Sequence, residues 1–237
     1  FGIVNAGELI MKRNLRILFK CLLLSGFVSL TAAMAQATTY TFVGDGKWDN
    51  PNNWDANGAP PNPLPAGSAV IINPPANADG IVGQPILNIA FEIESGASLM
   101  IFPAAGADRA LRMEKGGLIN SGTITVNGTL SVSDDSIFVN QGTMVLGDHS
   151  RLKTSGTFSN EADGTISVAS GGVLRIEGSL TNDGTLENKL GGNVETAANA
   201  ALNNNGTFVD EGTFNNYGTL RGNAPVVPPP SPEPQQG

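Results

Sequence analysis

Apolar and polar residues alternate in short segments that Gly-Thr dipeptides separate. In residues 122–150, GTITVNGTLSVSDDSIFVNQGTMVLGDHS, the second and fourth residues after Gly122 are apolar, and the pattern restarts at Gly142. Apolar residues two apart on β-branched, Thr-rich segments are typical of strands with one buried face. The repeats carry no apolar residues at i, i+3 and i+4 spacing, so the pattern predicts strands and excludes helical repeats.

The dipeptides recur with a period near 20 residues. They begin at Gly122, Gly142, Gly164, Gly184, Gly206 and Gly218, with spacings of 20, 22, 20, 22 and 12. A period of this length with two or three short strands per unit is typical of one coil of a parallel β-helix. We therefore predict an all-β, single-domain parallel β-helix (β-solenoid) over residues 81–222, with about 6–7 coils of roughly 20–22 residues. The alternative is a β-sandwich with coincidental turns. The final spacing predicts a last coil that is at most half complete.

An asparagine precedes five of these glycines by two or four residues. These residues are Asn120, Asn140, Asn160, Asn182 and Asn204. We predict that they stack once per coil, each side-chain amide bonding the next, as in the Asn ladders of cross-β stacks. The glycines are expected to supply positive φ at the corners without steric cost. Asn-x-Gly-Thr is thus interpreted as a structural corner.

The N-terminal region has the pattern of a secretory signal peptide at residues 11–35. A basic start is followed by an apolar run and by small-residue cleavage sites at 33–35 or 35–37. A transmembrane anchor is the alternative, but the unbroken apolar run is shorter than the ~20 residues that span a bilayer. Residues 1–10 precede Met11 and are expected to be a non-native upstream extension. No membrane insertion is expected after cleavage.

Both ends of the repeat region have a different composition. Residues 36–80 contain both tryptophans, Trp48 and Trp54, together with many prolines, and are predicted to form an N-terminal cap over the first open coil. The two rings are expected to plug the end of the core. The alternative is that they stack against sugar rings. Residues 223–237 are Pro-rich and are expected to form an extended linker that leads the chain away.

The residues described so far resemble a known group of proteins. The segment GKWDNPNNWDANGAPPNPLPAGSAVII (46–72), followed by Asn-x-Gly-Thr repeats, is similar to the N-terminal region of secreted bacterial β-solenoid surface proteins. These include large adhesins, autotransporter passengers and surface proteins of gliding bacteria. The resemblance implies a secreted or cell-surface location and an adhesive, scaffolding role. It also implies extracellular glycans or a host or neighbouring cell as partners, and a monomer or a part of a longer chain.

The charge balance limits the classes of partner that the protein is expected to bind. The first 35 residues hold four of the 13 basic and one of the 21 acidic residues, so the remainder carries nine basic and 20 acidic side chains, a net charge of −11. Nucleic acids and anionic lipids both need clusters of Lys and Arg, so neither is an expected partner. The single cysteine, Cys21, lies in the predicted signal peptide. The exported part must therefore be held together by packing and backbone pairing.

An enzyme of the polysaccharide lyase or hydrolase type is the main rival, since such β-helices use clustered Asp, Arg and Lys side chains. The candidates are Asp134, Asp135, Asp148, His149, Arg151 and Lys153. Aspartates are common at turns for backbone reasons, so these residues are predicted to be solvated. With one histidine and no cysteine in the exported part, neither a catalytic triad with a second imidazole or a thiol nor a Cys/His zinc site can form. We predict no enzyme, catalytic residue, cofactor or metal. A calcium site built from carboxylates stays open.

Overall fold

The structure is a computed structural model, and it describes residues 38–48, 50–55, 58–61, 68–73, 77–79, 84–86, 89–101 and 111–229. The chain divides into two units, Phe1–Gln36 and Ala37–Gly237, and every described residue belongs to the second. The predicted signal peptide, the upstream extension and the last eight residues therefore lie outside the described residues.

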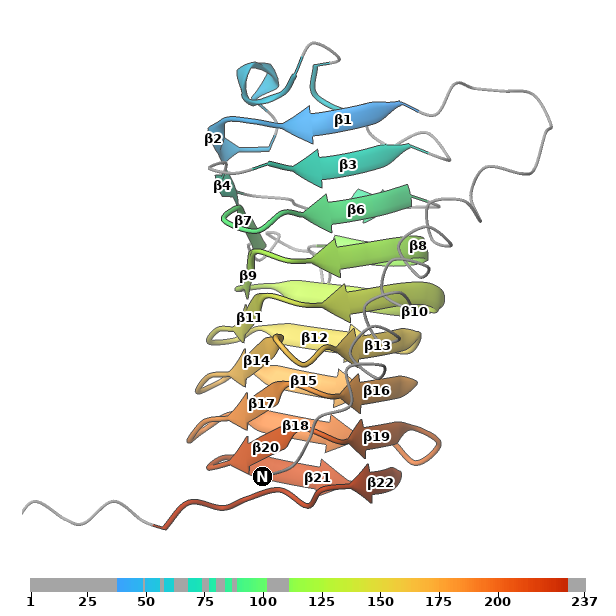
Figure 1. The fold of residues 1–237 in the computed structure, drawn as a ribbon, viewed down its shortest axis with the longest axis vertical. Helices are drawn as coiled ribbons and strands as arrows, with labels where there is room; N and C mark the ends of the chain where they lie inside the picture. The colour runs from blue at the N-terminus through green and yellow to red at the C-terminus, as the bar shows by residue number, and fades with distance from the viewer. Residues whose placement is uncertain are drawn as a thin grey trace, which may run out of the picture. The chain divides into compact units, whose positions relative to one another are not determined.

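The second unit is built from short parallel strands that stack in three files, here called the first, second and third faces (Figure 1). The first face contains β2 (Asp45–Lys47), β4 (Asn77–Asp79), β7 (Ser98–Ile101), β9 (Thr123–Val126), β11 (Thr143–Leu146), β14 (Thr165–Val168), β17 (Thr185–Asn188) and β20 (Thr207–Asp210). The second contains β5 (Gln84–Ile86), the first parts of β8 (Leu111–Asn120) and β10 (Thr129–Asn140), then β12 (Arg151–Thr154), β15 (Val173–Ile176), β18 (Asn193–Thr196) and β21 (Thr213–Asn216). The third contains β1 (Thr39–Phe42), β3 (Ala69–Ile72), β6 (Ile89–Ile93), the second parts of β8 and β10, then β13 (Thr157–Asn160), β16 (Ser179–Asn182), β19 (Ala201–Asn204) and β22 (Thr219–Gly222).

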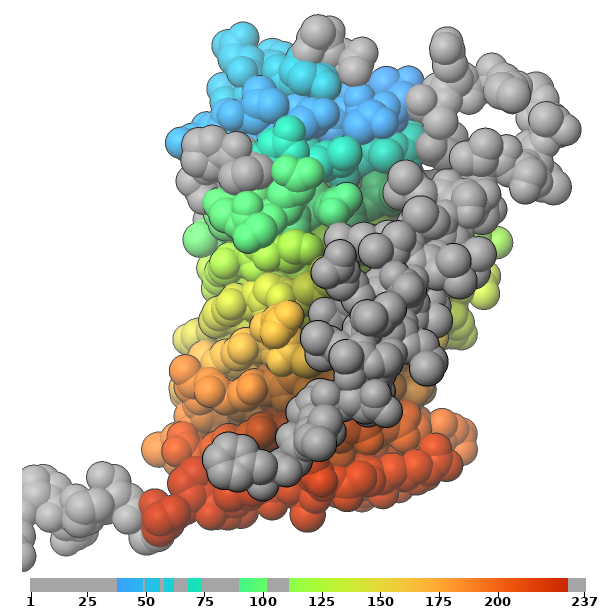
Figure 2. Space-filling view, in the orientation of Figure 1, coloured from blue at the N-terminus to red at the C-terminus, as the bar shows by residue number. Residues whose placement is uncertain are grey.

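In the repeat region these strands form a parallel β-solenoid of about six turns with roughly 21 residues per turn, so the predicted fold class is confirmed. The stacking begins earlier than residue 81, because β1 to β4 lie within residues 36–80, the segment predicted to be a cap. One 3₁₀ turn, η1 (Pro51–Asn53), interrupts the strands near the start. Successive coils lie in direct contact along the visible side (Figure 2). In the described part of the chain, no helix has the length and apolar character needed to cross a membrane.

The alternation of coil lengths between 20 and 22 residues comes from the corners. From β9 onward each face uses four residues of strand, and the corners between them contain two or four residues. Because side chains alternate between inside and outside, an even number of corner residues keeps every strand in phase with the core. All two-residue corners end in glycine, followed by threonine or serine. This is why Gly-Thr recurs.

The last coil is complete, so the expectation of a half coil is wrong. Residues 207–222 supply β20, β21 and β22, one strand for each face. Gly206, Gly212 and Gly218 mark the three successive corners of this one coil. The apparent period shrinks to 12 because Gly218 precedes a third-face strand, whereas Gly206 precedes a first-face strand.

The corner glycines are needed for space, and the expectation that they supply positive φ is also wrong for the Gly-Thr dipeptides. None of the six dipeptide glycines has positive φ, which occurs instead at Gly171 and Gly191 in four-residue corners. A Cβ added to Gly142 would overlap the carbonyl oxygen of Gly122 in the coil before it. Adjacent coils approach so closely at these corners that only a hydrogen fits.

The interior is a continuous stack of apolar side chains. In the strands from β9 to β19 the second residue is fully buried and apolar, as in Ile124, Leu130 and Phe138. Like residues lie above like: the rings of Phe138 and Phe158, on adjacent third-face strands, stack with centroids 4.5 Å apart. Burial of such side chains stabilises the fold by about 1.5–3 kcal/mol each relative to exposure. Together with backbone pairing between coils, this packing holds the described unit together.

A file of asparagine amides runs inside the third face, here called the Asn file. Its members are Asn120, Asn140, Asn160, Asn182 and Asn204, all 0% exposed. Each Nδ2 donates to the Oδ1 of the next at 2.6–2.7 Å, and the Nδ2 of Asn204 donates to the carbonyl of Asn223 at 2.8 Å. Ile93 occupies the position before Asn120, whose Oδ1 has no partner in the described structure. The file thus begins at an apolar residue and ends on a backbone group.

Replacing Asn160 by Ala is expected to lower the free energy of unfolding by about 2–3 kcal/mol. The change leaves the Nδ2 of Asn140 and the Oδ1 of Asn182 buried with fewer partners, and unsatisfied buried polar groups cost about 1–3 kcal/mol. Urea unfolding measures the effect. The control is Asn199→Ala, since Asn199 is exposed in a four-residue corner. Equal effects of the two substitutions would contradict a stabilising role for the Asn file.

The two tryptophans pack against each other at the start of the solenoid. Their ring centroids are 4.5 Å apart with perpendicular planes, and the Nε1 of Trp54 donates to the carbonyl of Trp48 at 2.9 Å. Trp48 also stacks on Phe91, and the residues Trp48 and Trp54 are only 8% and 5% exposed. Trp54 forms an antiparallel bridge with Phe42 of β1, which covers the edge of β1 opposite β3. This burial favours the plug over the sugar-stacking interpretation, which stays a prediction.

The first residues of the Pro-rich segment pair with the last coil. Val226 forms a parallel bridge with Val209 of β20: its N–H donates to the carbonyl of Phe208 at 2.7 Å, and its carbonyl accepts from Asp210 at 2.9 Å. The segment 223–237, predicted to be an extended linker, is therefore paired with the solenoid at its start, whereas residues 230–237 lie outside the described residues. Pro225 has no N–H to donate, but the next residue does, so one proline does not prevent this contact.

Removing residues 224–237 is expected to lower the free energy of unfolding by no more than about 1–2 kcal/mol, because two backbone hydrogen bonds are lost. The removal exposes the edge of β20 beside those of β21 and β22, which have no outer strand partner among the described residues. Open edges recruit further strands, so we expect end-to-end association in light scattering. The control is a chain that ends after Pro229 and keeps Val226. If both truncated chains stay monomeric at high concentration, the segment does not protect the edge.

Candidate functional site

Outward side chains on the second face form a row along the solenoid, and their size and charge differ from coil to coil. The strand register places Ser131 of β10 between Arg112 of β8 and Lys153 of β12. Arg175 of β15 and Glu195 of β18 continue the row. Ser131 is short where its neighbours are long. The outer surface over β10 is therefore lower than the surface over β8 and β12 on either side.

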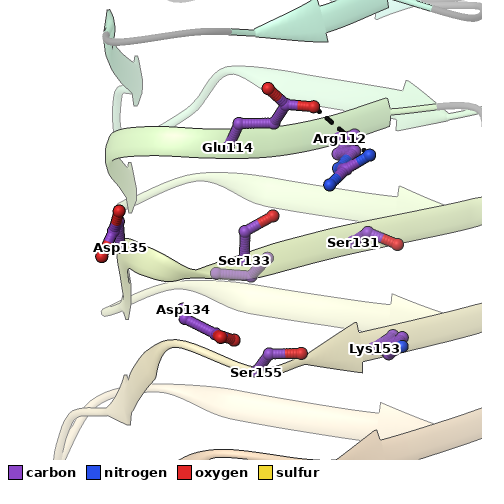
Figure 3. A pocket seen from close by; sticks show the side chains of 9 residues that line it. Arg112, Glu114, Ser131, Ser133, Asp134, Asp135, Lys153 and Ser155 are labelled. Carbon is purple, nitrogen blue, oxygen red and sulfur yellow. Dashed lines mark ion pairs between the residues drawn. The ribbon is translucent and has the colours of Figure 1, made fainter.

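A groove of about 410 Å³ lies over this low coil (Figure 3). We call it the serine groove. Its lining residues are Arg112, Glu114, Ser131, Val132, Ser133, Asp134, Asp135, Lys153 and Ser155. In Figure 3 the two cationic side chains lie on one side of the view, and Glu114, Asp134 and Asp135 lie toward the other.

A bulge in β10 forms the acidic side of the groove. The register between β10 and β8 shifts between Val132 and Asp135, so two residues of β10 oppose Glu114. The corner at this point has four residues, 133–136, whereas the next coil has only Ser155 and Gly156 there. β-Bulges redirect side chains and are common near functional sites. This one turns Asp134 and Asp135 outward, and both are exposed.

Nearly every charge around the groove already has a partner of opposite sign. The Nη1 of Arg112 lies 3.3 Å from the Oε1 of Glu114, and the Nζ of Lys115 lies 3.8 Å from the Oδ2 of Asp135. The Nζ of Lys153 lies 2.8 Å from the Oε2 of Glu177. Among the described residues no ion pair or hydrogen bond reaches the side chain of Asp134. Asp134 is therefore the groove carboxylate that is free to accept hydrogen bonds.

Glu177 sits at the centre of a charge cluster beside the groove. Its carboxylate contacts Lys153 at 2.8 Å and Arg175 at 2.7 Å, and it accepts a hydrogen bond from the Oγ of Ser155 at 3.2 Å. Arg175 also pairs with Glu195 at 3.2 Å. Partial burial alone would raise the pKa of Glu177. The hydrogen bonds and positive charges of Lys153 and Arg175 outweigh it and hold the pKa below its ordinary value.

Replacing Glu177 by Gln is expected to remove a small part of the acid sensitivity of the fold. A carboxyl whose folded pKa is lowered contributes stability above its unfolded pKa, and this contribution is lost as the pH falls through the folded pKa. The side chain is 24% exposed, so we expect less than about 1 kcal/mol. Urea unfolding of wild type and E177Q at pH 7 and again below about pH 4.5, the ordinary pKa of a glutamate, measures the difference in pH dependence. Glu211→Gln, at an exposed position, is the control. An equal pH dependence in wild type and E177Q would contradict the assignment.

The structure brings together half of the residues that the sequence marked as chemical candidates. Asp134, Asp135 and Lys153 line the serine groove. Asp148 and His149 lie instead in the exposed corner 147–150, with the Nε2 of His149 3.4 Å from the Oδ2 of Asp148 and side-chain exposures of 91% and 72%. His149 has a positive φ of 56°, which belongs to a turn. Arg151 is exposed at the start of β12.

Arg112, Glu114 and the groove serines were not among the candidates from sequence. A signal for them does exist, because Arg112, Ser131, Lys153, Arg175 and Glu195 follow one another at spacings of 19, 22, 22 and 20 residues in the register of the strands. Alignment of the outward positions coil by coil would have placed them on one face. In the described ranges, no three Asp, Glu, His or Cys side chains are grouped so that they could hold a metal ion.

Comparison with known proteins gives the relationship of the chain. The family model of the Haemagglutinin repeat matches residues 97–189 and 169–224. The two matches overlap and together span residues 97–224, which is 128 of the 237 residues. The chain belongs to the haemagglutinin repeat family. The haemagglutinin repeat covers the coils that carry the Asn file and the serine groove. This confirms the resemblance to adhesin-type β-solenoid proteins, whereas the tryptophan segment lies outside the matched residues.

Other comparisons add little to the haemagglutinin repeat match. A solved structure of a hyper-glycosylated TibA fragment, whose glycosylation TibC catalyses, is similar at 15% sequence identity. The alignment covers 79% of this chain and 81% of that chain with a TM-score of 0.26. A TM-score this low is no evidence of a shared fold. A search of curated proteins finds no match.

Proposed function

We propose that this chain is an exported structural and adhesive module of a bacterial cell-surface or extracellular protein. The observation that carries the proposal is the haemagglutinin repeat match over the solenoid coils. The module presents its outer faces to glycans or to the surface of a host or neighbouring cell. It acts without a catalytic residue, a cofactor or a metal, and it binds neither nucleic acid nor membrane.

The physical design of the solenoid supports this role. Inward positions repeat from coil to coil, because each coil must fit the one before it, whereas outward positions on the second face vary from Arg112 to Ser131 to Glu195. Repeat proteins of this kind present extended surfaces whose side chains can change without loss of the core. A stable scaffold with a variable surface suits recognition more than catalysis.

The second candidate is a carbohydrate-active protein, either a binder or a lyase. The observation in its favour is the serine groove, which places Asp134, Asp135 and Lys153 on one face. A lyase needs a base that can take a proton beside a cation that neutralises the uronate carboxylate. Lys153 is already paired with Glu177, so the groove supports binding better than elimination.

Adhesion of coated beads to cells tests the proposed function. Beads that carry residues 38–237 are expected to attach to bacterial or host cells in greater number than beads that carry an unrelated protein of equal negative charge. Release of unsaturated uronates from acidic polysaccharides is measured in parallel and is expected to be at background. Attachment equal to that of the control beads on every cell type tested would overturn the adhesive role. Uronate release above background would favour the lyase.

A further inference from the structure

We propose that the serine groove binds a neutral, hydroxyl-rich glycan segment of one or two sugar rings. The inference rests on the proposed adhesive function and names the ligand class and its site. The serine groove has a volume of about 410 Å³, which falls within the roughly 300–1,000 Å³ of small-molecule sites. Ser131, Ser133 and Asp134 of β10 provide the polar groups of its floor and bulge.

The polar groups that remain free in the groove match sugar hydroxyls. Asp134 is an exposed carboxylate without a partner in the described structure, and a carboxylate accepts hydrogen bonds from two neighbouring hydroxyl groups. Hydrogen bonds to a charged group are stronger than those between neutral groups. Ser131 and Ser133 each offer a hydroxyl that donates and accepts. A ligand that carries several hydroxyls in a compact ring can satisfy all three.

The paired cations argue against an acidic ligand. The charges of Arg112 and Lys153 are neutralised by Glu114 and Glu177, at 3.3 and 2.8 Å. A uronate or sulfate would have to displace one of these carboxylates and would also meet the free charge of Asp134. Like charges that approach without compensation cost binding energy and so provide discrimination. The groove should therefore prefer neutral sugars over polyuronates.

The side chains at both ends of the groove can still take part as donors. The guanidinium of Arg112 has five N–H groups and the ammonium of Lys153 has three, so one carboxylate partner does not use them all. Both cations border the coil of Ser131 from opposite sides in the strand register. They can donate to sugar oxygens while they remain paired. This places the glycan contact on the second face, away from the buried rings of Trp48 and Trp54.

Two groove variants and one matched control test the site. Ser131→Trp fills the groove from an outward position, and Asp134→Ala removes the free carboxylate. Asp148→Ala is the control, because Asp148 is an exposed aspartate in a corner outside the groove. Residues 38–237 of each variant are titrated with neutral gluco-, galacto- and manno-oligosaccharides and with polyuronate oligosaccharides. Urea unfolding of each variant confirms that the fold is kept.

The wild type and Asp148→Ala are expected to bind at least one neutral oligosaccharide with equal Kd, and to bind the uronates at least tenfold more weakly. Each groove variant is expected to lose at least tenfold in affinity for the neutral ligand. Equal affinity of wild type and groove variants, a preference for uronates, or the absence of glycan binding would overturn the inference. If beads still adhere to cells in any of these cases, the proposed function stands without this site. Glycan binding without adhesion to cells would instead preserve the site and reject the adhesive role.

Discussion

Replacing Ile166 by Asp is expected to unfold much of the solenoid, with a loss of about 3–5 kcal/mol in the free energy of unfolding. Ile166 is 0% exposed, and the strand register places it between Met144 and Leu186 of the neighbouring coils. A carboxylate at this position is shut off from solvent and lies between apolar side chains, and an uncompensated buried charge carries a penalty of this size. Urea unfolding followed by far-UV circular dichroism measures the loss.

The matched comparison for Ile166→Asp is His149→Ala. His149 has a side chain that is 91% exposed, and it lies in the corner after β11. Its replacement is expected to cost about 0.5 kcal/mol or less, as at an ordinary surface site. A larger effect at His149 than at Ile166 would contradict the assignment of the inward positions as the source of stability. Loss of adhesion in His149→Ala would show that the corner has a functional role.

Replacing Gly142 by Ala is expected to cost on the order of 3 kcal/mol or more, although it adds a single methyl group. The new Cβ would overlap the carbonyl oxygen of Gly122, and the other close atoms are also backbone atoms of Ser121 and Gly122. Backbone in the preceding coil cannot move aside without breaking hydrogen bonds such as that from Thr143 to Gly122, at 2.8 Å. The clash must therefore be relieved by separation of two coils.

Gly117→Ala provides the control for the corner glycine. The nearest atom to a Cβ at Gly117 is the carbonyl oxygen of Ile137 at 3.9 Å, an ordinary contact, and its φ is not positive. Alanine at such a position restricts the unfolded chain and is neutral or slightly stabilising, by up to about 1 kcal/mol. Thermal unfolding of both variants gives the comparison. Similar melting temperatures for G142A and G117A would show that coil spacing does not limit the corner.

These glycines explain the repeat more directly than backbone conformation does. A parallel β-solenoid must keep its coils at the spacing of paired strands, about 4.8 Å, even where the chain turns sharply. At a two-residue corner the turn brings one coil's backbone against that of the previous coil. Glycine is then required at Gly142 and Gly206, where a methyl group would overlap a carbonyl of the preceding coil. The following threonine begins the next strand, which suits a β-branched residue.

The sequence by itself determined the fold class, because its signals are local. Alternation of apolar and polar residues fixes which side of each strand is buried, and the Gly-Thr period fixes the coil length. The identity of the Asn file was also readable from sequence, since Asn140 and Asn160 recur at the end of equivalent strands. These features need no knowledge of what lies beside each coil.

Only the tertiary structure decided which corners are equivalent and which side chains meet. Gly206 and Gly218 both precede a threonine, but they lie at different corners of the coil. The sequence pattern does not distinguish these corners, because corners of two and of four residues both preserve the alternation of inward and outward side chains. The register that brings Arg112, Ser131 and Lys153 together depends on these corner lengths and on the bulge in β10. The pairing of Val226 with β20 depends on where the last coil ends. Local pattern fixes what faces inward, whereas the outer surface is assembled from residues about 20 positions apart, and backbone pairing between coils sets their order.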